Sequence, residues 1–167
     1  MVRLKLSLSV RMFIFLIGIF VSAGLSPAYA QVGTTPKVDV PRGWKKIELR
    51  DFSLEIPPGM KKRDVRGIDS EVWEYRSRDL RLAIDYGMYS NDLESYADRP
   101  EYKAEWISID GKEAKVATYR SGKDYVAAVY FPGLWGSDTK LGFSVESKSA
   151  TGQELSKKIF QSIRFRR

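Results

Sequence analysis

Apolar and polar residues alternate over most of the chain after Trp44, with the two-residue period of half-buried β-strands. Residues 52–56 illustrate the pattern, because Phe52, Leu54 and Ile56 are separated by a serine and a glutamate. Prolines, glycines and polar pairs interrupt the alternation. The pattern predicts strands over 44–49, 52–56, 71–76, 80–89, 102–109, 112–120, 125–131 and 140–147.

Turn residues mark where these strands end. Asp110-Gly111 is the strongest hairpin signal in the chain, since both residues accept the positive φ of a tight two-residue turn. Pro57-Pro58-Gly59 ends an earlier strand, because proline donates no hydrogen bond to a sheet. The polar stretch 61–70 is predicted to be a loop.

The C-terminal segment has a helical period. Thr151 and Glu154 have the spacing of a capping box, which begins a helix. Apolar residues then recur every four positions and form one stripe, which consists of Leu155, Ile159 and Ile163. Residues 164–167 are expected to leave the helix. We therefore predict an α+β fold, with an antiparallel sheet of about seven to eight strands and the C-terminal helix packed on one face.

The first 30 residues have the order of a secretory signal peptide. Basic residues precede an apolar run over 12–25, and Ala28-Tyr29-Ala30 has the small-x-small pattern of a cleavage site. The apolar run has 14 residues, whereas a helix needs about 20 to cross a bilayer. We predict cleavage after Ala30 and a periplasmic or secreted protein. It is not expected to be a lipoprotein, because lipid attachment at the cleavage site needs a cysteine.

The chain is thus divided into a signal peptide over 1–30, a flexible leader over 31–43 and a single α+β domain over 44–167. The sequence contains 28 Lys plus Arg and 21 Asp plus Glu, a net charge of +7. Loss of the three basic residues of the signal leaves 25 positive and 21 negative groups, a net charge of +4. A balance of this size keeps a small domain soluble and does not indicate a nucleic acid partner.

The 167 residues include no cysteine and no histidine. This composition excludes disulfides, thiolate and imidazole metal sites, and catalysis that uses a cysteine or histidine. The sequence also lacks the phosphate-loop, dinucleotide-binding and G-x-S-x-G motifs. We assign no catalytic residue, no metal ligand and no cofactor, and we expect a protein that is not an enzyme.

Three short motifs carry a resemblance to a known group. Residues 52–59 (FSLEIPPG), 109–114 (IDGKEA) and 159–165 (IFQSIRF) resemble the opening, the central hairpin and the closing segment of small exported domains of the PsbP/Mog1-like group. The resemblance spans the region from Trp44 to Phe165. It implies an antiparallel sheet covered by helices and a role in docking onto a larger partner, as PsbP does on photosystem II and Mog1 on a small GTPase. The matching segments belong to the framework of these domains, so the resemblance places no partner-binding residue on this chain.

Carboxylates are the remaining candidates for acid-base chemistry. Asp85, Asp92 and Glu94 lie within ten residues of each other, and 91–100 is expected to be a loop with one short helical turn that Asn91 or Asp92 caps. Paired carboxylates can hydrolyse glycosides, and with carbonyl groups they can bind calcium. The segment lacks the spacing of an EF-hand loop, and an acidic turn is more often simply solvated. Hydrolysis and calcium binding are therefore minor alternatives.

Aromatic residues at strand period usually pack in a core or across strands, and we expect this for Trp73, Tyr75, Trp106 and Tyr119. The turn that follows residue 131 differs, because large apolar residues stand where the chain must reverse at the surface. A partner contact is predicted there, at Tyr130, Phe131, Leu134 and Trp135. In the competing interpretation, Leu134 and Trp135 fold back and close the open end of the sheet.

Basic residues cluster at 61–66, 76–81, 157–158 and 164–167. Such clusters can bind lipid head groups or anionic envelope polymers, although acids interleave with several of them. Our leading hypothesis is an exported accessory domain that binds an envelope or secreted protein, without nucleic acid and with no membrane contact beyond the signal peptide. The alternative is a protein that binds or senses a small ligand or an anionic polymer, with a pocket between sheet and helix.

Overall fold

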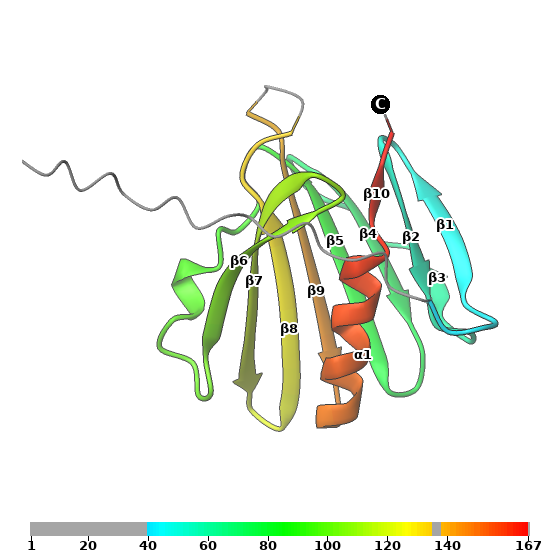
Figure 1. The fold of residues 1–167 in the computed structure, drawn as a ribbon, viewed down its shortest axis with the longest axis vertical. Coiled ribbons are helices and arrows are strands. Elements are labelled where there is room, and N and C mark those ends of the chain that lie inside the picture. Colours follow the sequence, from blue (N-terminus) through cyan, green and yellow to red (C-terminus); the bar gives the residue numbers. More distant parts are fainter. Residues whose placement is uncertain (1–39, 135–137, 167) are drawn as a thin grey trace, which may run out of the picture. The chain divides into compact units, whose positions relative to one another are not determined.

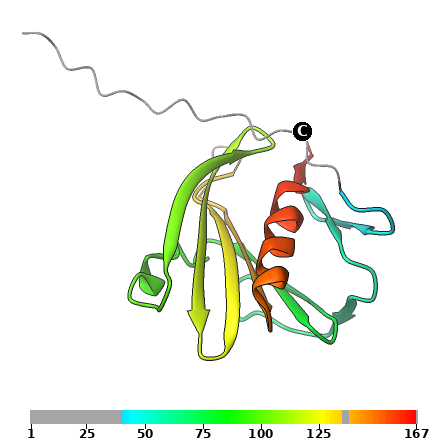
Figure 2. The same ribbon diagram turned by 60° about the horizontal axis from the view of Figure 1, so that its bottom comes forward.

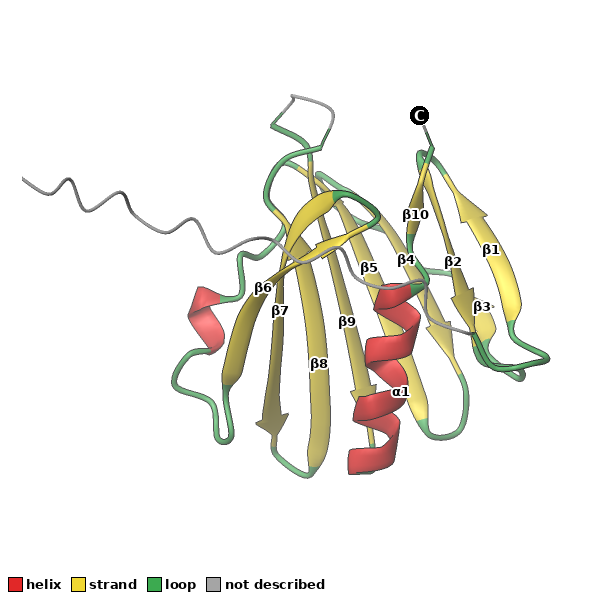
Figure 3. Cartoon of the chain, in the orientation of Figure 1, coloured by secondary structure: helices red, strands yellow, loops and turns green. Residues whose placement is uncertain are grey.

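The computed structural model describes residues 40–134 and 138–166, so the predicted signal peptide and most of the leader lie outside the described residues. This part of the chain has the predicted α+β fold, with two antiparallel sheets and one C-terminal α-helix (Figures 1 and 3). The large sheet contains β3 (Lys61–Arg63), β4 (Glu71–Arg76), β5 (Leu80–Gly87), β6 (Lys103–Ile109), β7 (Lys112–Ser121), β8 (Asp124–Phe131) and β9 (Lys140–Ser147). The small sheet contains β1 (Lys45–Leu49), β2 (Phe52–Ile56) and β10 (Arg164–Phe165), and the helices are η1 (Glu94–Tyr96, a 3-10 helix) and α1 (Ala150–Gln161).

The large sheet has the strand order β3-β4-β5-β9-β8-β7-β6, and every neighbouring pair is antiparallel. The hairpin predicted at Asp110-Gly111 joins β6 to β7, and both turn residues have positive φ, 49° and 76°. β9 lies between β5 and β8, so the centre of the sheet combines strands that are far apart in the sequence. The register of these three strands decides which side chains meet on each face.

One face of the large sheet carries the main core. Alternate residues of the central strands, among them Ile84, Val129 and Phe143, are buried beneath α1 and the small sheet. Figures 1 and 2 show α1 lying along this face over β8 and β9. Phe143 contacts three other buried rings, those of Phe52, Phe131 and Phe160, at centroid distances between 5.5 and 6.4 Å. We call this the helix-covered face.

The small sheet closes the core at the side of α1. Phe52 of β2 packs edge-on against Trp73 and Phe143 of the large sheet. Ser162, directly after α1, accepts a 2.9 Å hydrogen bond at its Oγ from the backbone N–H of Glu55. The chain then leaves the helix as predicted and pairs with β2 through Arg164 and Phe165. The last residues therefore complete the sheet that begins the domain.

The helix begins at a different residue from the one predicted. Its N-cap is Ser149, whose Oγ accepts a 3.1 Å hydrogen bond from the N–H of Gly152, so the capping box at Thr151 and Glu154 was wrong. Of the predicted stripe, Leu155 is partly buried and Ile159 fully buried on α1. Ile163 is also fully buried, but it lies after the end of α1 at Gln161, so the stripe is shorter than predicted. The described residues contain no helix with the length and apolar character that crossing a membrane requires.

Two further expectations about the sheet need correction. Residues 61–63, predicted to be loop, form β3, an exposed edge strand that pairs with β4. Trp106 was expected to pack in the core or across strands. It lies opposite Lys115 on the edge strand β6 and is 53% exposed, so it is not a core residue. The other three aromatics of that group, Trp73, Tyr75 and Tyr119, are buried as predicted.

Candidate functional site

The second face of the large sheet, opposite α1, holds a cleft of about 430 Å³. This volume falls within the range of about 300–1,000 Å³ that small-molecule sites occupy. The cleft lies over β4, β5, β9 and β8, and the segment around η1 forms one of its walls. We call this face of the sheet the cleft face. The alternative drawn from the sequence placed a ligand pocket between the sheet and the helix. This cleft lies on the opposite face of the sheet.

Small side chains make the floor of the cleft. The register aligns Ala83 of β5 with Ser144 of β9, and Ser144 with Ala128 of β8. Gly142 follows on the same face of β9, opposite Asp85. Because none of these side chains extends far from the backbone, the middle of the sheet is hollow while the larger residues around it stand higher.

The wall over β7 and β8 is a second, smaller apolar cluster. Leu93, 4% exposed, packs on Ala117, Ala128 and Tyr130. Leu93 has a positive φ of 70°, a conformation that is uncommon for a leucine. The segment needs strong local anchoring to hold this conformation, and its neighbours supply it.

Polar contacts anchor this segment to the sheet. Lys115 of β7 is buried to 6% exposure and its ammonium donates to the carboxylate of Glu94. That hydrogen bond is the main cause that raises the pKa of Lys115 above its usual value. The Tyr102 hydroxyl donates to the carbonyl of Leu93 over 3.3 Å, and the ring of Tyr96 stacks on that of Tyr119 with centroids 4.8 Å apart. The wall is therefore fixed to the sheet at several points.

Asn91 and Asp92 hold the turn, as the sequence suggested, although neither is the N-cap residue of η1. The Oδ1 of Asn91 accepts a hydrogen bond from the N–H of Leu93, and the Oδ1 of Asp92 accepts one from the N–H of Glu94. Both side chains thus stabilise the backbone that carries Leu93 into the cluster.

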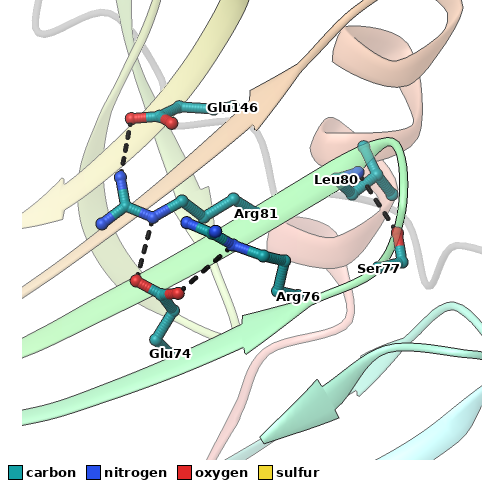
Figure 4. A network of polar contacts seen from close by, with 6 residues as sticks. All are labelled: Glu74, Arg76, Ser77, Leu80, Arg81 and Glu146. Carbon is teal, nitrogen blue, oxygen red and sulfur yellow. Dashed lines mark hydrogen bonds and ion pairs between the residues drawn. The ribbon is translucent and has the colours of Figure 1, made fainter. Parts of the chain in front are cut away.

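One end of the cleft is a network of charged side chains (Figure 4). Arg81 donates from Nε to Glu74 over 2.9 Å and from Nη1 to Glu146 over 3.1 Å. Arg76 also lies near Glu74, with Nε 3.4 Å from Oε1. The hydrogen bond to Glu74, followed by the charge of Glu146, raises the pKa of Arg81. Both glutamates at this end are thus already matched by a guanidinium.

Tyr119 lies beside this network and remains a neutral phenol. Burial is the main cause that raises its pKa, and the neighbouring Tyr96 adds to the effect. The Tyr119 hydroxyl therefore stays protonated at neutral and moderately alkaline pH.

Asp85 lies toward the other end of the cleft and, unlike Glu74 and Glu146, forms no ion pair within the described residues. Its Oδ1 is buried and accepts no hydrogen bond from the part of the chain that the structure describes. The Ser90 hydroxyl bonds to the backbone carbonyl of Asp85 and does not bond to its carboxylate. A buried carboxylate oxygen without a donor is costly, because it has lost the hydrogen bonds that water would supply. Asp85 is the least satisfied charged group in the cleft.

Two loops border the cleft at the end near Asp85, since Val65 and Ser70 of the loop before β4 and Asn91 of the loop after β5 line it. The loop before β4 touches the end of β5 there, since Ser70 lies so close to Gly87 that a Cβ on that glycine would come within 2.7 Å of the serine Cβ. Both loops present large side chains to solvent, namely Val65, Ile68, Met88 and Tyr89, with exposures of 36%, 104%, 54% and 72%. We call these four residues the apolar rim.

The loop predicted as a partner contact lies elsewhere. Tyr130 and Phe131 are buried in β8, Leu134 is also buried, and Trp135 lies outside the described residues. Tyr130 packs in the cluster under Leu93, and Phe131 packs on the helix-covered face. Because Tyr130, Phe131 and Leu134 are buried, our proposals concern other surfaces. The partner contact at residues 130–135 stays a prediction.

Of the three carboxylates singled out in the sequence, only Asp85 lines the cleft. Asp92 supports the turn and Glu94 pairs with Lys115. Within residues 40–134 and 138–166, no three acidic side chains converge in a way that could hold a metal ion.

The basic clusters are partly neutralised by neighbouring acids. Ion pairs join Arg78 to Asp79 and Lys157 to Glu154, in addition to those of Arg76 and Arg81. β3, in contrast, presents three exposed basic residues. The surface is mixed in sign over most of these clusters.

No protein-family model matches the chain, and no curated protein matches it. The function must therefore be inferred from the geometry of the site.

Proposed function

We propose that this protein is an exported binding protein for a small ligand, which occupies the cleft on the cleft face of the large sheet. The observation that carries the proposal is the cleft itself, with its floor of small residues and the unmatched carboxylate of Asp85. A hollow of this size lined by apolar groups and a few polar groups is typical of a ligand site. The predicted signal peptide supports a role outside the cytoplasm.

The geometry favours binding over hydrolysis. A carboxylate-dependent hydrolase needs two carboxyl groups with different affinities for a proton. Glu74 and Glu146 are both paired with Arg81, which leaves Asp85 alone in the cleft. We therefore propose a protein that binds its ligand without converting it.

A fragment screen by ligand-observed NMR tests the proposal, with a variant that fills the cleft. Ala83→Ile places a larger side chain on the floor and is expected to abolish binding of the fragments that the unmodified protein binds. Ala104→Ile is the matched control, because Ala104 lies on β6 outside the cleft and is exposed. Fragments that bind both variants and the unmodified protein equally would contradict the proposal.

Protein docking is the second candidate, and one observation favours it. β6 is an edge strand of the large sheet, and its Trp106 is 53% exposed. An edge strand offers backbone groups for pairing with another chain, and tryptophan is common in binding surfaces. The resemblance to PsbP/Mog1-like domains supports the same idea.

Crosslinking of the tagged protein in its native cells tests the docking candidate. We expect one envelope or secreted protein to be enriched and to be lost with Trp106→Thr. Tyr89→Thr is the control, since Tyr89 is also exposed but follows β5, which three strands separate from β6 in the sheet. A partner retained by Trp106→Thr would remove the edge strand from consideration.

A further inference from the structure

We infer that the ligand of the cleft is a primary amine on an apolar body, and that the carboxylate of Asp85 holds its ammonium group. The inference rests on the proposed function, since it names the chemical class that the same cleft accepts. Three features support it: the charge of the lining, the state of Asp85 and the apolar surfaces beside it.

The lining of the cleft is acidic in a chain that is basic as a whole. Its charged residues are Glu74, Asp85, Glu146 and Arg81, and Arg76 lies 3.4 Å from Glu74 at the same end, so three carboxylates and two guanidinium groups give a net charge of −1. The complete sequence has a net charge of +7. Because a cleft concentrates the field of the groups that line it, this site attracts cations and repels anions.

Asp85 is the acidic group that a ligand can match. Arg81 already bonds to both glutamates, whereas Asp85 forms no ion pair with any residue in the described ranges. An ammonium group has three N–H donors and a positive charge, so it can satisfy the carboxylate and cancel its charge together. The terminal torsion of an aspartate is broad, so a small rotation turns either oxygen toward the ligand.

The surfaces near Asp85 fit an apolar body. Leu93 forms the wall on one side, and Val72 lies beside Asp85 on β4. Val65, one of the four residues of the apolar rim, also lines the cleft. An amine seated on Asp85 can therefore lay its carbon chain against the wall or extend it toward the apolar rim.

A metal ion fits these residues less well. Calcium takes six to eight oxygen ligands, several of them from carboxylates. Asp85 has no second unpaired carboxylate beside it in the cleft, and no acidic cluster that could hold a metal occurs in the described part of the chain. The chemistry therefore points to an organic cation.

Calorimetric titration with matched probes tests the inference. The probes are n-alkylamines from butylamine to octylamine, each compared with the alcohol and the carboxylate of the same chain length, and calcium chloride as a metal control. We expect the amines to bind, the alcohols to bind at least about tenfold more weakly, and the carboxylates and calcium not to bind. A charge-assisted hydrogen bond has this magnitude.

Variants of Asp85 connect the selectivity to this side chain. Asp85→Asn is expected to weaken amine binding at least about tenfold and to leave alcohol binding unchanged. Asp85→Glu keeps the charge and is expected to retain part of the preference for amines. Asp98→Asn is the matched control, because Asp98 is exposed and does not line the cleft. The melting temperature of each variant shows that it is folded.

The outcomes separate the inference from the proposed function. If alcohols, carboxylates or calcium bind as tightly as the amines, or if Asp85→Asn binds amines normally, the inference is overturned while the cleft can still be a binding site. If fragments of other classes bind in the cleft and no amine does, the inference is likewise overturned and the proposed function stands. If neither amines nor any fragment is sensitive to Ala83→Ile, the proposed function is overturned as well.

Discussion

The two faces of the large sheet are built from the same strands and differ in what their side chains do. On the helix-covered face, Phe143 and its neighbours fill the space beneath α1 and the small sheet. On the cleft face, the next residue along β9, Ser144, lies in a row of small side chains that leaves a hollow. Successive side chains of a strand point to opposite faces of the sheet, so one face packs the core and the other forms the cleft. Substitutions on the two faces should differ accordingly.

Phe143→Ala should have the largest effect on stability. Phe143 is 2% exposed and contacts three buried rings, so its removal leaves a cavity that the rigid sheet cannot fill. We expect a loss of about 3–5 kcal/mol in the free energy of unfolding. Ser144→Ala is the matched change on the cleft face and should cost less than about 0.5 kcal/mol. Urea denaturation measures both, and equal losses would break the comparison between the faces.

Gly152→Ala should have the next largest effect, again on the helix-covered side. A Cβ on Gly152 would lie 2.3 Å from the Oγ and 2.6 Å from the Cβ of Ser147, so either the helix or β9 must move. We expect a loss of about 1–3 kcal/mol by urea denaturation, as for other overpacked sites. Thr151→Ala, one position earlier and exposed, should change the stability by less than about 0.5 kcal/mol. A stabilising Gly152→Ala would mean that α1 is not docked this closely.

Lys115→Met tests whether the wall of the cleft can loosen while the rest of the sheet stays intact. The change keeps the apolar stem of Lys115 and removes its hydrogen bond to Glu94. We expect a global loss below about 1 kcal/mol, because the pair is exposed on the Glu94 side. Hydrogen exchange should accelerate at the amides of Tyr96 and Ala97, which bond within the η1 turn. The exposed Lys103→Met is the control, and unchanged exchange at both amides would contradict the anchoring role.

Tyr86→Phe should have the smallest effect at neutral pH and a distinct effect in alkali. Burial, followed by the 2.8 Å hydrogen bond to Asp51, raises the pKa of Tyr86 from 10.0 to about 12. Because the folded state holds this proton more tightly than the unfolded state, its contribution to stability is complete below pH 10 and is lost as the pH rises to about 12. Chemical denaturation between pH 9 and 12 should show a shallower decline for Tyr86→Phe. Tyr89→Phe, at an exposed site, should leave the slope unchanged.

The strands and the C-terminal helix could be predicted from the sequence because each has a local period. β4 and β9 have the predicted bounds, and the Asp110-Gly111 hairpin has the predicted turn geometry. β3 was missed because its three residues are all basic and form a strand only by pairing with β4. Local pattern is therefore enough for strands with a buried face and is not enough for a short edge strand.

Position in the sheet could not be derived in the same way. Trp106 has the period of a core residue, but no described element covers that part of β6, so it is exposed. The cleft depends on the alignment of Ala83, Ser144 and Ala128, which come from three strands with β9 inserted between β5 and β8. The sequence shows the small residues that form the floor of the cleft, but only the register of the strands shows that they lie side by side. Asp85 was a candidate from its type and position, and its missing donor became visible only in three dimensions.

The pairing of β10 with β2 also has a consequence for the order of events during synthesis. Arg164 and Phe165 lie opposite Ser53 and Phe52, so one edge of β2 has no neighbour until residues 164 and 165 have been synthesised. The bond between Ser162 and Glu55, 107 residues apart, is delayed in the same way. Contacts this distant in sequence form late and slowly. The core beneath α1 and the small sheet consequently closes only after residues 159–165 have been synthesised, so the strands that come earlier in the sequence cannot complete the domain by themselves.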